Sequence, residues 1–83
     1  MTERLTLGEL RVGDTARVKT LDKTDLSYRE KLLAFGLTPG TVLTVERVAP
    51  FGDPVEVRVR GFALSLRRGE AAAVTVERIE SPL

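Results

Sequence analysis

The chain is 83 residues long, with 42% hydrophobic residues, 13 basic and 12 acidic side chains, and a formal net charge of +1. This length fits one domain with a small core, and the near balance of charge does not point to nucleic acid as a partner. The absence of cysteine and histidine excludes disulfides and the chemistry of thiolate and imidazole groups. No secretory signal is evident, and no apolar run approaches the ~20 residues that cross a bilayer, so we expect a cytosolic protein.

The first elements are short. Residues 5–10 are expected to form one helical turn, with Thr6 as its cap and Leu7 and Leu10 on one face. Apolar and charged residues then alternate over 15–21, which predicts a strand with one buried face and one solvated face.

A helix is predicted from Ser27, because Ser27 and Glu30 have the spacing of a capping box. Four apolar side chains then form a stripe at helical spacing: Tyr28, Leu32, Leu33 and Phe35. The helix is expected to end at Gly36, with Leu37 folding back onto Leu32 in a Schellman motif. Pro39 and Gly40 follow as the two central residues of a predicted type II turn.

From Thr41 onward the apolar period changes to two. Four more strands are predicted: residues 41–46, 55–60, 62–66 and 74–76. Gly61 marks a tight turn between two of them, and residues 68–70 are predicted to be a link. Five short strands with one or two short helices predict a mainly β, partly open small barrel. We expect one domain over residues 1–83, with its core at about 6–79 and a loose tail at 80–83.

The order and spacing of these motifs resemble the FeoA family. Residues 28–40 follow the pattern Tyr-Arg-x-Lys-Leu-Leu-x-x-Gly-x-x-Pro-Gly, and residues 47–54 read Arg-Val-Ala-Pro-x-Gly-Asp-Pro. The resemblance runs from about residue 7 to residue 79. The structural positions of the pattern, besides Ser27 and Glu30, are Gly36, Pro39, Gly40, Pro50, Gly52, Asp53, Pro54 and Gly61.

The resemblance implies an SH3-like barrel and a noncatalytic accessory role in bacterial ferrous iron uptake. It also implies a partner, the cytosolic GTPase region of a FeoB-type membrane transporter. GTP hydrolysis would belong to that partner, since this chain has no Gly-x-x-x-x-Gly-Lys-Ser/Thr loop to hold phosphates.

The residues themselves give no strong case for catalysis or metal binding. Ser27 is better explained as a helix cap than as a nucleophile, and Asp22 and Asp25 belong to a predicted solvated loop. The remaining candidate oxygen ligands are scattered along the chain: Asp14, Asp53 and Glu70. We therefore expect no catalytic residue, no cofactor and no dedicated metal site.

Five residues are candidates for partner binding: Arg29, Lys31, Phe51, Arg58 and Arg60. Arg29 and Lys31 are predicted to face outward from the helix. Phe51 is either an exposed anchor or a lid over the barrel end, and the sequence leaves both open. Arg58 and Arg60 are predicted on the outer face, where solvation or an acidic protein partner is favoured over RNA.

Two other functions stay open, and both use the same kind of barrel. One is a regulatory SH3-like module, as found in iron-dependent repressors. The other is a small RNA-binding barrel that would use the outer arginines Arg58, Arg60, Arg67 and Arg68, although we expect no nucleic-acid partner. Self-association and the sign of any effect on transport are also open.

Overall fold

The computed structural model describes residues 5–21 and 26–79 of the chain. The elements in chain order are β1 (Leu5–Thr6), the 3-10 turn η1 (Leu7–Glu9), β2 (Thr15–Leu21), α1 (Leu26–Ala34), β3 (Val42–Val48), β4 (Val55–Val59), β5 (Phe62–Leu66), α2 (Arg68–Ala72) and β6 (Val74–Ile79). The predicted tail at 80–83 and the predicted loop carboxylates Asp22 and Asp25 lie outside the described residues.

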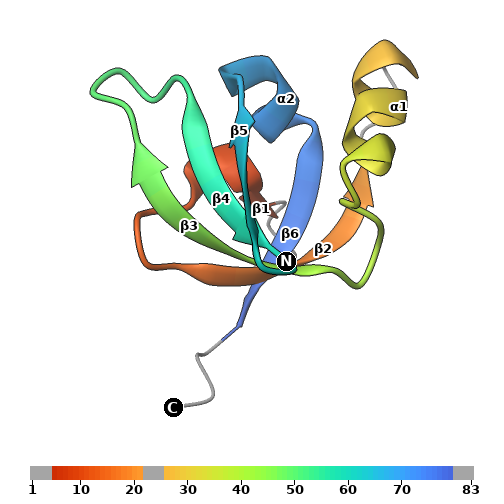
Figure 1. The fold of residues 1–83 in the computed structure, drawn as a ribbon, viewed down its shortest axis with the longest axis horizontal. Coiled ribbons are helices and arrows are strands. Elements are labelled where there is room, and N and C mark those ends of the chain that lie inside the picture. The colour runs from red at the N-terminus through yellow and green to blue at the C-terminus, as the bar shows by residue number, and fades with distance from the viewer. Residues whose placement is uncertain (1–4, 22–25, 80–83) are drawn as a thin grey trace.

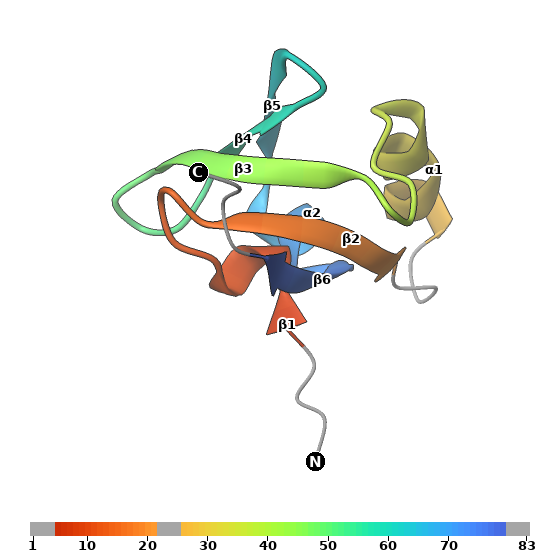
Figure 2. The same ribbon diagram turned by 90° about the horizontal axis from the view of Figure 1, so that it is seen from below.

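The described strands form one antiparallel sheet in the order β1-β6-β2-β3-β4-β5. The sheet is twisted and bent (Figure 1), and Figure 2 shows the two edge strands, β1 and β5, on opposite sides of the molecule. The predicted mainly β, partly open barrel is therefore confirmed. The sequence pattern missed β1 because an element of two residues is too short to show an alternating period.

The core lies on the inner face of this sheet, as the period of two requires. In β4 the three valines Val55, Val57 and Val59 are 3%, 0% and 0% exposed. The intervening Arg58 is exposed, because successive side chains of a strand point to opposite faces. Burial of each such side chain stabilises the fold by about 1.5–3 kcal/mol.

Phe62 departs from the predicted pattern of β5. Leu64 and Leu66 are buried as expected, but Phe62 is 44% exposed. The reason is its position: it is the first residue of an edge strand, directly after a turn, so only β4 covers it.

The helical turn predicted over residues 5–10 is confirmed only over Leu7–Glu9, since Leu5 and Thr6 form β1. Thr6 caps η1, and the Glu9 carboxylate accepts a hydrogen bond from the Thr6 amide at 2.7 Å. Leu7 and Leu10 are both buried, as their shared face predicts.

Helix α1 begins at Leu26, one residue earlier than predicted. The predicted capping box is therefore wrong, because a cap precedes the first helical residue and Ser27 lies inside the first turn. The cap position, residue 25, lies outside the described residues. Glu30 is exposed on the helix surface.

The apolar stripe of α1 is only partly buried. Leu32 is 0% exposed and Phe35 packs against the core, but Leu33 is 37% exposed. The side chain of Tyr28 lies outside the described part of the structure. A helix at the end of a small barrel meets the core along a narrow line, so the wider stripe predicted with Leu33 is wrong.

The end of α1 follows the prediction. Gly36 has a φ of 91°, in the left-handed region that glycine adopts without steric cost. Its amide donates to the Leu33 carbonyl at 3.0 Å, and the Leu37 amide donates to the Leu32 carbonyl at 3.0 Å. These two bonds define a Schellman motif, and both Leu32 and Leu37 are fully buried.

The predicted type II turn is also present. The Thr41 amide donates to the Thr38 carbonyl at 3.0 Å, and Gly40 between them has a φ of 95°. The buried Thr41 hydroxyl donates to the Gly36 carbonyl at 3.1 Å, which ties the turn to the helix end.

Helix α2 is a correction, because the sequence predicted a link at 68–70. The chain forms a helix over Arg68–Ala72, with Arg67 at the cap position. The Glu70 carboxylate accepts a hydrogen bond from the Arg67 amide at 2.8 Å, which satisfies one of the free amides of the first turn. Five residues are too few to show a helical period. In the sequence, only the position of Glu70 three residues after Arg67 could have indicated the helix.

Candidate partner-binding surface

Phe51 is exposed at the tip of the loop between β3 and β4. Its exposed fraction is 89%, which decides between the two predicted alternatives in favour of an exposed aromatic. The loop is closed by two backbone hydrogen bonds, from the Gly52 amide to the Ala49 carbonyl at 2.8 Å and from the Ala49 amide to the Pro54 carbonyl at 3.1 Å. Phe51 is therefore held out in solvent by a loop with fixed ends.

This loop also contacts the start of α2. The Asp53 carboxylate accepts a hydrogen bond from the Arg68 amide at 3.3 Å. Figure 1 shows the β3–β4 loop, α2 and α1 at the same end of the molecule. An aromatic side chain and the basic residues Arg67 and Arg68 therefore share this end of the barrel.

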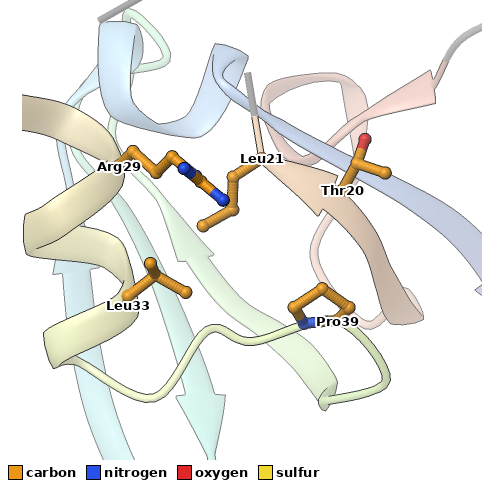
Figure 3. Close-up of a pocket in the computed structure, with 5 residues that line it drawn as sticks. All are labelled: Thr20, Leu21, Arg29, Leu33 and Pro39. Atoms are coloured by element: carbon orange, nitrogen blue, oxygen red, sulfur yellow. The ribbon is translucent and has the colours of Figure 1, made fainter. Parts of the chain in front are cut away.

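Arg29 lies at a small pocket beside α1. The pocket has a volume of about 150 Å³ and is lined by Thr20, Leu21, Arg29, Leu33 and Pro39. Figure 3 shows Arg29 extending from the helix toward Leu21 of β2. Arg29 is exposed, as predicted, and its guanidinium stands over a mainly apolar hollow.

Lys31 has a specific internal contact that the sequence did not indicate. Its Nζ lies 2.6 Å from an oxygen of the Glu70 carboxylate, so it joins α1 to α2. The same Nζ lies 5.9 Å from the centre of the Phe35 ring, within the range of a cation–π contact. The Lys31 side chain is 49% exposed, but its ammonium group is already engaged within the fold.

Glu70 is the buried partner in this pair, with an exposed fraction of 3%. Burial raises the pKa of its carboxyl group, but the hydrogen bonds from Lys31 and the Arg67 amide, with the two nearby positive charges, outweigh burial and lower the pKa overall. Glu70 is therefore ionised at neutral pH. From the sequence, Glu70 was only one of several candidate oxygen ligands scattered along the chain. The available indication was its place three residues after Arg67, the spacing of a helix-capping glutamate.

Arg58 and Arg60 occupy different environments. Arg58 is on the outer face, as predicted, and donates from Nε and Nη2 to the two Glu46 oxygens at 2.8 and 3.3 Å. The hydrogen bonds to Glu46, together with the negative charge of Glu46, raise the pKa of Arg58 above its ordinary value. Arg60 is not part of the strand, since β4 ends at Val59, and its φ of 52° places it in the turn with Gly61.

The predicted binding residues do not form one patch. Figure 1 shows the Phe51 loop and the β4–β5 turn that holds Arg60 at opposite ends of the sheet. Arg29 and Lys31 lie on α1, and Arg58 is paired on the outer face. Sequence spacing could assign an outward face to Arg29, Lys31 and Arg58, but it carried no information about which strand ends meet.

The described residues contain no group of three or more acidic side chains that could hold a metal ion. Within residues 5–21 and 26–79 there is also no helix long and apolar enough to cross a membrane.

Comparison with known proteins identifies first the fold of the chain and then its family. A zinc-bound FeoA of Stenotrophomonas maltophilia, described as a procaryotic SH3 domain protein, superposes with a TM-score of 0.78 at 26% identity, covering 88% of this chain and 89% of that one. The open, mainly β sheet described above is thus an SH3-like fold. The FeoA domain model matches residues 5–78, and the chain belongs to the FeoA family, which is linked to ferrous iron transport.

Two further relatives support this assignment. A FeoA-like protein from Clostridium acetobutylicum superposes with a TM-score of 0.86 at 33% identity, covering 98% of this chain and 93% of that one. A curated relative from Porphyromonas gingivalis is 37% identical over 75 residues, which is 90% of this chain. That relative is described as an Fe(2+) transport protein A/Fe(2+) transporter FeoB fusion protein, and the chain spans 9% of its length.

The same fold also occurs in a transcriptional repressor. A manganese-dependent repressor superposes with a TM-score of 0.86 at 21% identity, and the match covers 95% of this chain but 38% of the repressor chain. At this identity the likeness concerns the fold alone.

Proposed function

We propose that this chain is a noncatalytic accessory protein of ferrous iron uptake that acts in the cytoplasm by binding the cytosolic part of a FeoB-type transporter. The observation that carries the proposal is the Porphyromonas gingivalis relative, whose name joins the two proteins in one chain. Fusion holds two domains at a high effective concentration, and a separate chain needs a binding surface to reach the same arrangement.

The described carboxylates support a role without catalysis. Within residues 5–21 and 26–79, the carboxyl groups of Asp14 and Glu70 have a pKa below the ordinary value. For Asp14 the main cause is the hydrogen bond from the Arg11 amide, which outweighs its burial. A general acid needs a pKa near neutrality, so these shifts favour structural ion pairs over proton transfer.

Phe51 and Arg29 are the residues we assign to docking. Phe51 is 89% exposed on a closed loop, so the backbone that carries it is held in place before binding. Arg29 is exposed at an apolar pocket, where its planar guanidinium suits a carboxylate of the partner. We do not assign Lys31 and Arg58 to docking, because their charges already pair with Glu70 and Glu46.

The test is a calorimetric titration of the chain into the full-length FeoB-type transporter of the source organism in detergent. The isolated GTPase region serves as a second titrant, and GTP turnover is followed in parallel. Saturable binding supports the proposal, and a changed turnover rate gives the sign of regulation. A folded sample that binds neither form refutes it.

Docking through Phe51 is tested by Phe51→Ala, with Val12→Ala as a control at another exposed apolar residue, whose exposed fraction is 61%. We expect Phe51→Ala to weaken binding by tenfold or more while the melting temperature stays unchanged. Equal affinity of the two variants would remove Phe51 from the docking surface. Arg29→Ala is expected to weaken binding to a smaller extent, and an unchanged affinity would remove Arg29 as well.

A further inference from the structure

Strand β5 has one unpaired edge. It is the last strand of the sheet and pairs only with β4. The two strands are joined by Arg60 and Gly61, whose φ values of 52° and 86° are both positive, as in a two-residue type I′ hairpin. Such a hairpin closes on a hydrogen-bonded pair, here Val59 and Phe62.

The register then decides which backbone groups are free. Hydrogen-bonded pairs alternate along an antiparallel ladder, so every second residue of β5 directs its amide and carbonyl toward β4. The two residues between them, Ala63 and Ser65, direct theirs to the open edge. Within the described structure neither makes a backbone hydrogen bond to a turn or loop, and both are exposed. The edge therefore presents two amides and two carbonyls to solvent.

This edge lacks the usual protection against strand pairing. The sequence of β5 is Phe-Ala-Leu-Ser-Leu, with no charged residue and no proline. The opposite edge of the sheet is different, because β1 has two residues and the Thr6 amide already donates to the Glu9 carboxylate at 2.7 Å. Of the two edge strands, β5 is therefore the one suited to pairing with an incoming strand.

Charge at the ends of β5 indicates what kind of strand fits. Arg60 precedes the strand and Arg67 and Arg68 follow it, and none of the three makes an ion pair within the described residues. An antiparallel pairing of two copies would bring Arg60 of one copy opposite Arg67 and Arg68 of the other. Like charges across a ladder are destabilising, so a second copy of this chain is disfavoured. A segment with acidic residues at both ends is complementary in charge to the basic residues at the two ends of β5.

We propose that the β5 edge binds an extended, acid-flanked segment of the FeoB-type partner as an added strand. This inference rests on the proposed function and names the binding mode. The half-exposed Phe62 offers an apolar contact to a side chain of the added strand. The far end of β5 reaches the Phe51 loop, since Val55 pairs with Leu66 and Asp53 binds the Arg68 amide, so the edge and that loop form one continuous surface.

Hydrogen exchange measured by mass spectrometry on the full chain, alone and bound to full-length transporter in detergent, tests the inference. In the free chain we expect the Ala63 and Ser65 amides to exchange rapidly, and in the complex we expect at least tenfold slower exchange in peptides that cover β5. Binding without protection of β5 overturns the inference and leaves the proposed function intact. No binding to the transporter overturns both. Protection that depends on the concentration of the free chain identifies a second copy as the occupant and also overturns the inference.

Two variants separate the edge from the fold. Ser65→Pro removes an edge amide that the β4 ladder does not use, whereas Ser65→Thr keeps that amide. We expect Ser65→Pro to weaken transporter binding tenfold or more and Ser65→Thr to bind as the wild type does. If Ser65→Pro fails to fold, the double variant Arg60→Glu, Arg68→Glu tests the charge complementarity without altering β5, with the same tenfold loss expected. Wild-type affinity in the folded proline variant, or in the charge variant used in its place, overturns the inference.

Discussion

Replacement of Lys31 by methionine should destabilise the fold because it leaves the Glu70 carboxylate buried without its ammonium partner. Glu70 is 3% exposed, and Lys31 Nζ lies 2.6 Å from it. Removal of one member of a fully buried pair costs about 3–5 kcal/mol. The Lys31 side chain is 49% exposed, so water screens the pair and the Arg67 amide still donates. We therefore expect a loss of about 1–3 kcal/mol in the free energy of unfolding.

For a domain of this size, each kcal/mol corresponds to about 4–8 °C in melting temperature. The assay is denaturant unfolding at neutral pH, supported by thermal melts. Lys19→Met is the matched control, since it removes the same charge from an exposed lysine in β2. Its free energy of unfolding should stay within about 0.5 kcal/mol of wild type.

The pH dependence of Lys31→Met tests the cause. The Glu70 pKa is lowered in the folded protein, so its contribution is complete above the ordinary pKa of glutamate and is lost as the pH falls through the lowered value. In the Lys31→Met variant, Glu70 loses one of the hydrogen bonds that oppose the effect of its burial, so the pKa of Glu70 rises. Protonation then removes the buried charge, and the difference from wild type should shrink between pH 5 and pH 3. A difference below about 0.5 kcal/mol at pH 7, or one that is the same at both ends of this range, would refute the reasoning.

Three further predictions concern local structure. Arg60→Asn should raise the free energy of unfolding by about 0.5–1 kcal/mol, because asparagine tolerates the left-handed φ of 52° before Gly61, and a less stable variant in denaturant unfolding would contradict this. Leu37→Ala should lower the free energy of unfolding by about 2–5 kcal/mol, since Leu37 is 0% exposed. Leu33→Ala should lower it by less than about 1 kcal/mol, because Leu33 is 37% exposed. Equal losses in the two variants would contradict the assigned burial. Asp14→Asn should destabilise the fold at pH 7, because the hydrogen bonds with the Arg11 amide and the Arg78 side chain become weaker. This effect should fade as the pH falls below the lowered pKa of Asp14. A loss of stability that persists in acid would exclude the Asp14 charge as its cause.

Local rules were sufficient wherever neighbouring residues determine the conformation. The strand over 15–21 and the Schellman motif at Gly36 were predicted at their observed positions, because each depends on side-chain period or on glycine at a left-handed position. The start of α1 and the helix α2 were missed. A boundary shift of one residue and a five-residue helix leave no periodic pattern in the sequence.

The candidate surface depended more strongly on the tertiary structure. The sequence identified Phe51 as an aromatic in a turn, but its exposure follows from how the loop closes beyond the sheet. The pairing of Lys31 with Glu70 joins residues far apart in the chain, and the sequence contained no spacing rule that connects them. The free edge of β5 follows from the strand order, which leaves that strand without a second neighbour.

By itself, the sequence determined the fold class, because alternating strands and turn-forming residues at fixed spacing leave few arrangements for a small core. The family was indicated by the resemblance of residues 28–40 and 47–54 to the FeoA pattern. Only the tertiary structure decided which charges are neutralised within the fold and which surfaces stay open. Burial, ion pairing and strand order depend on contacts between distant segments, and these contacts form only when the sheet is assembled.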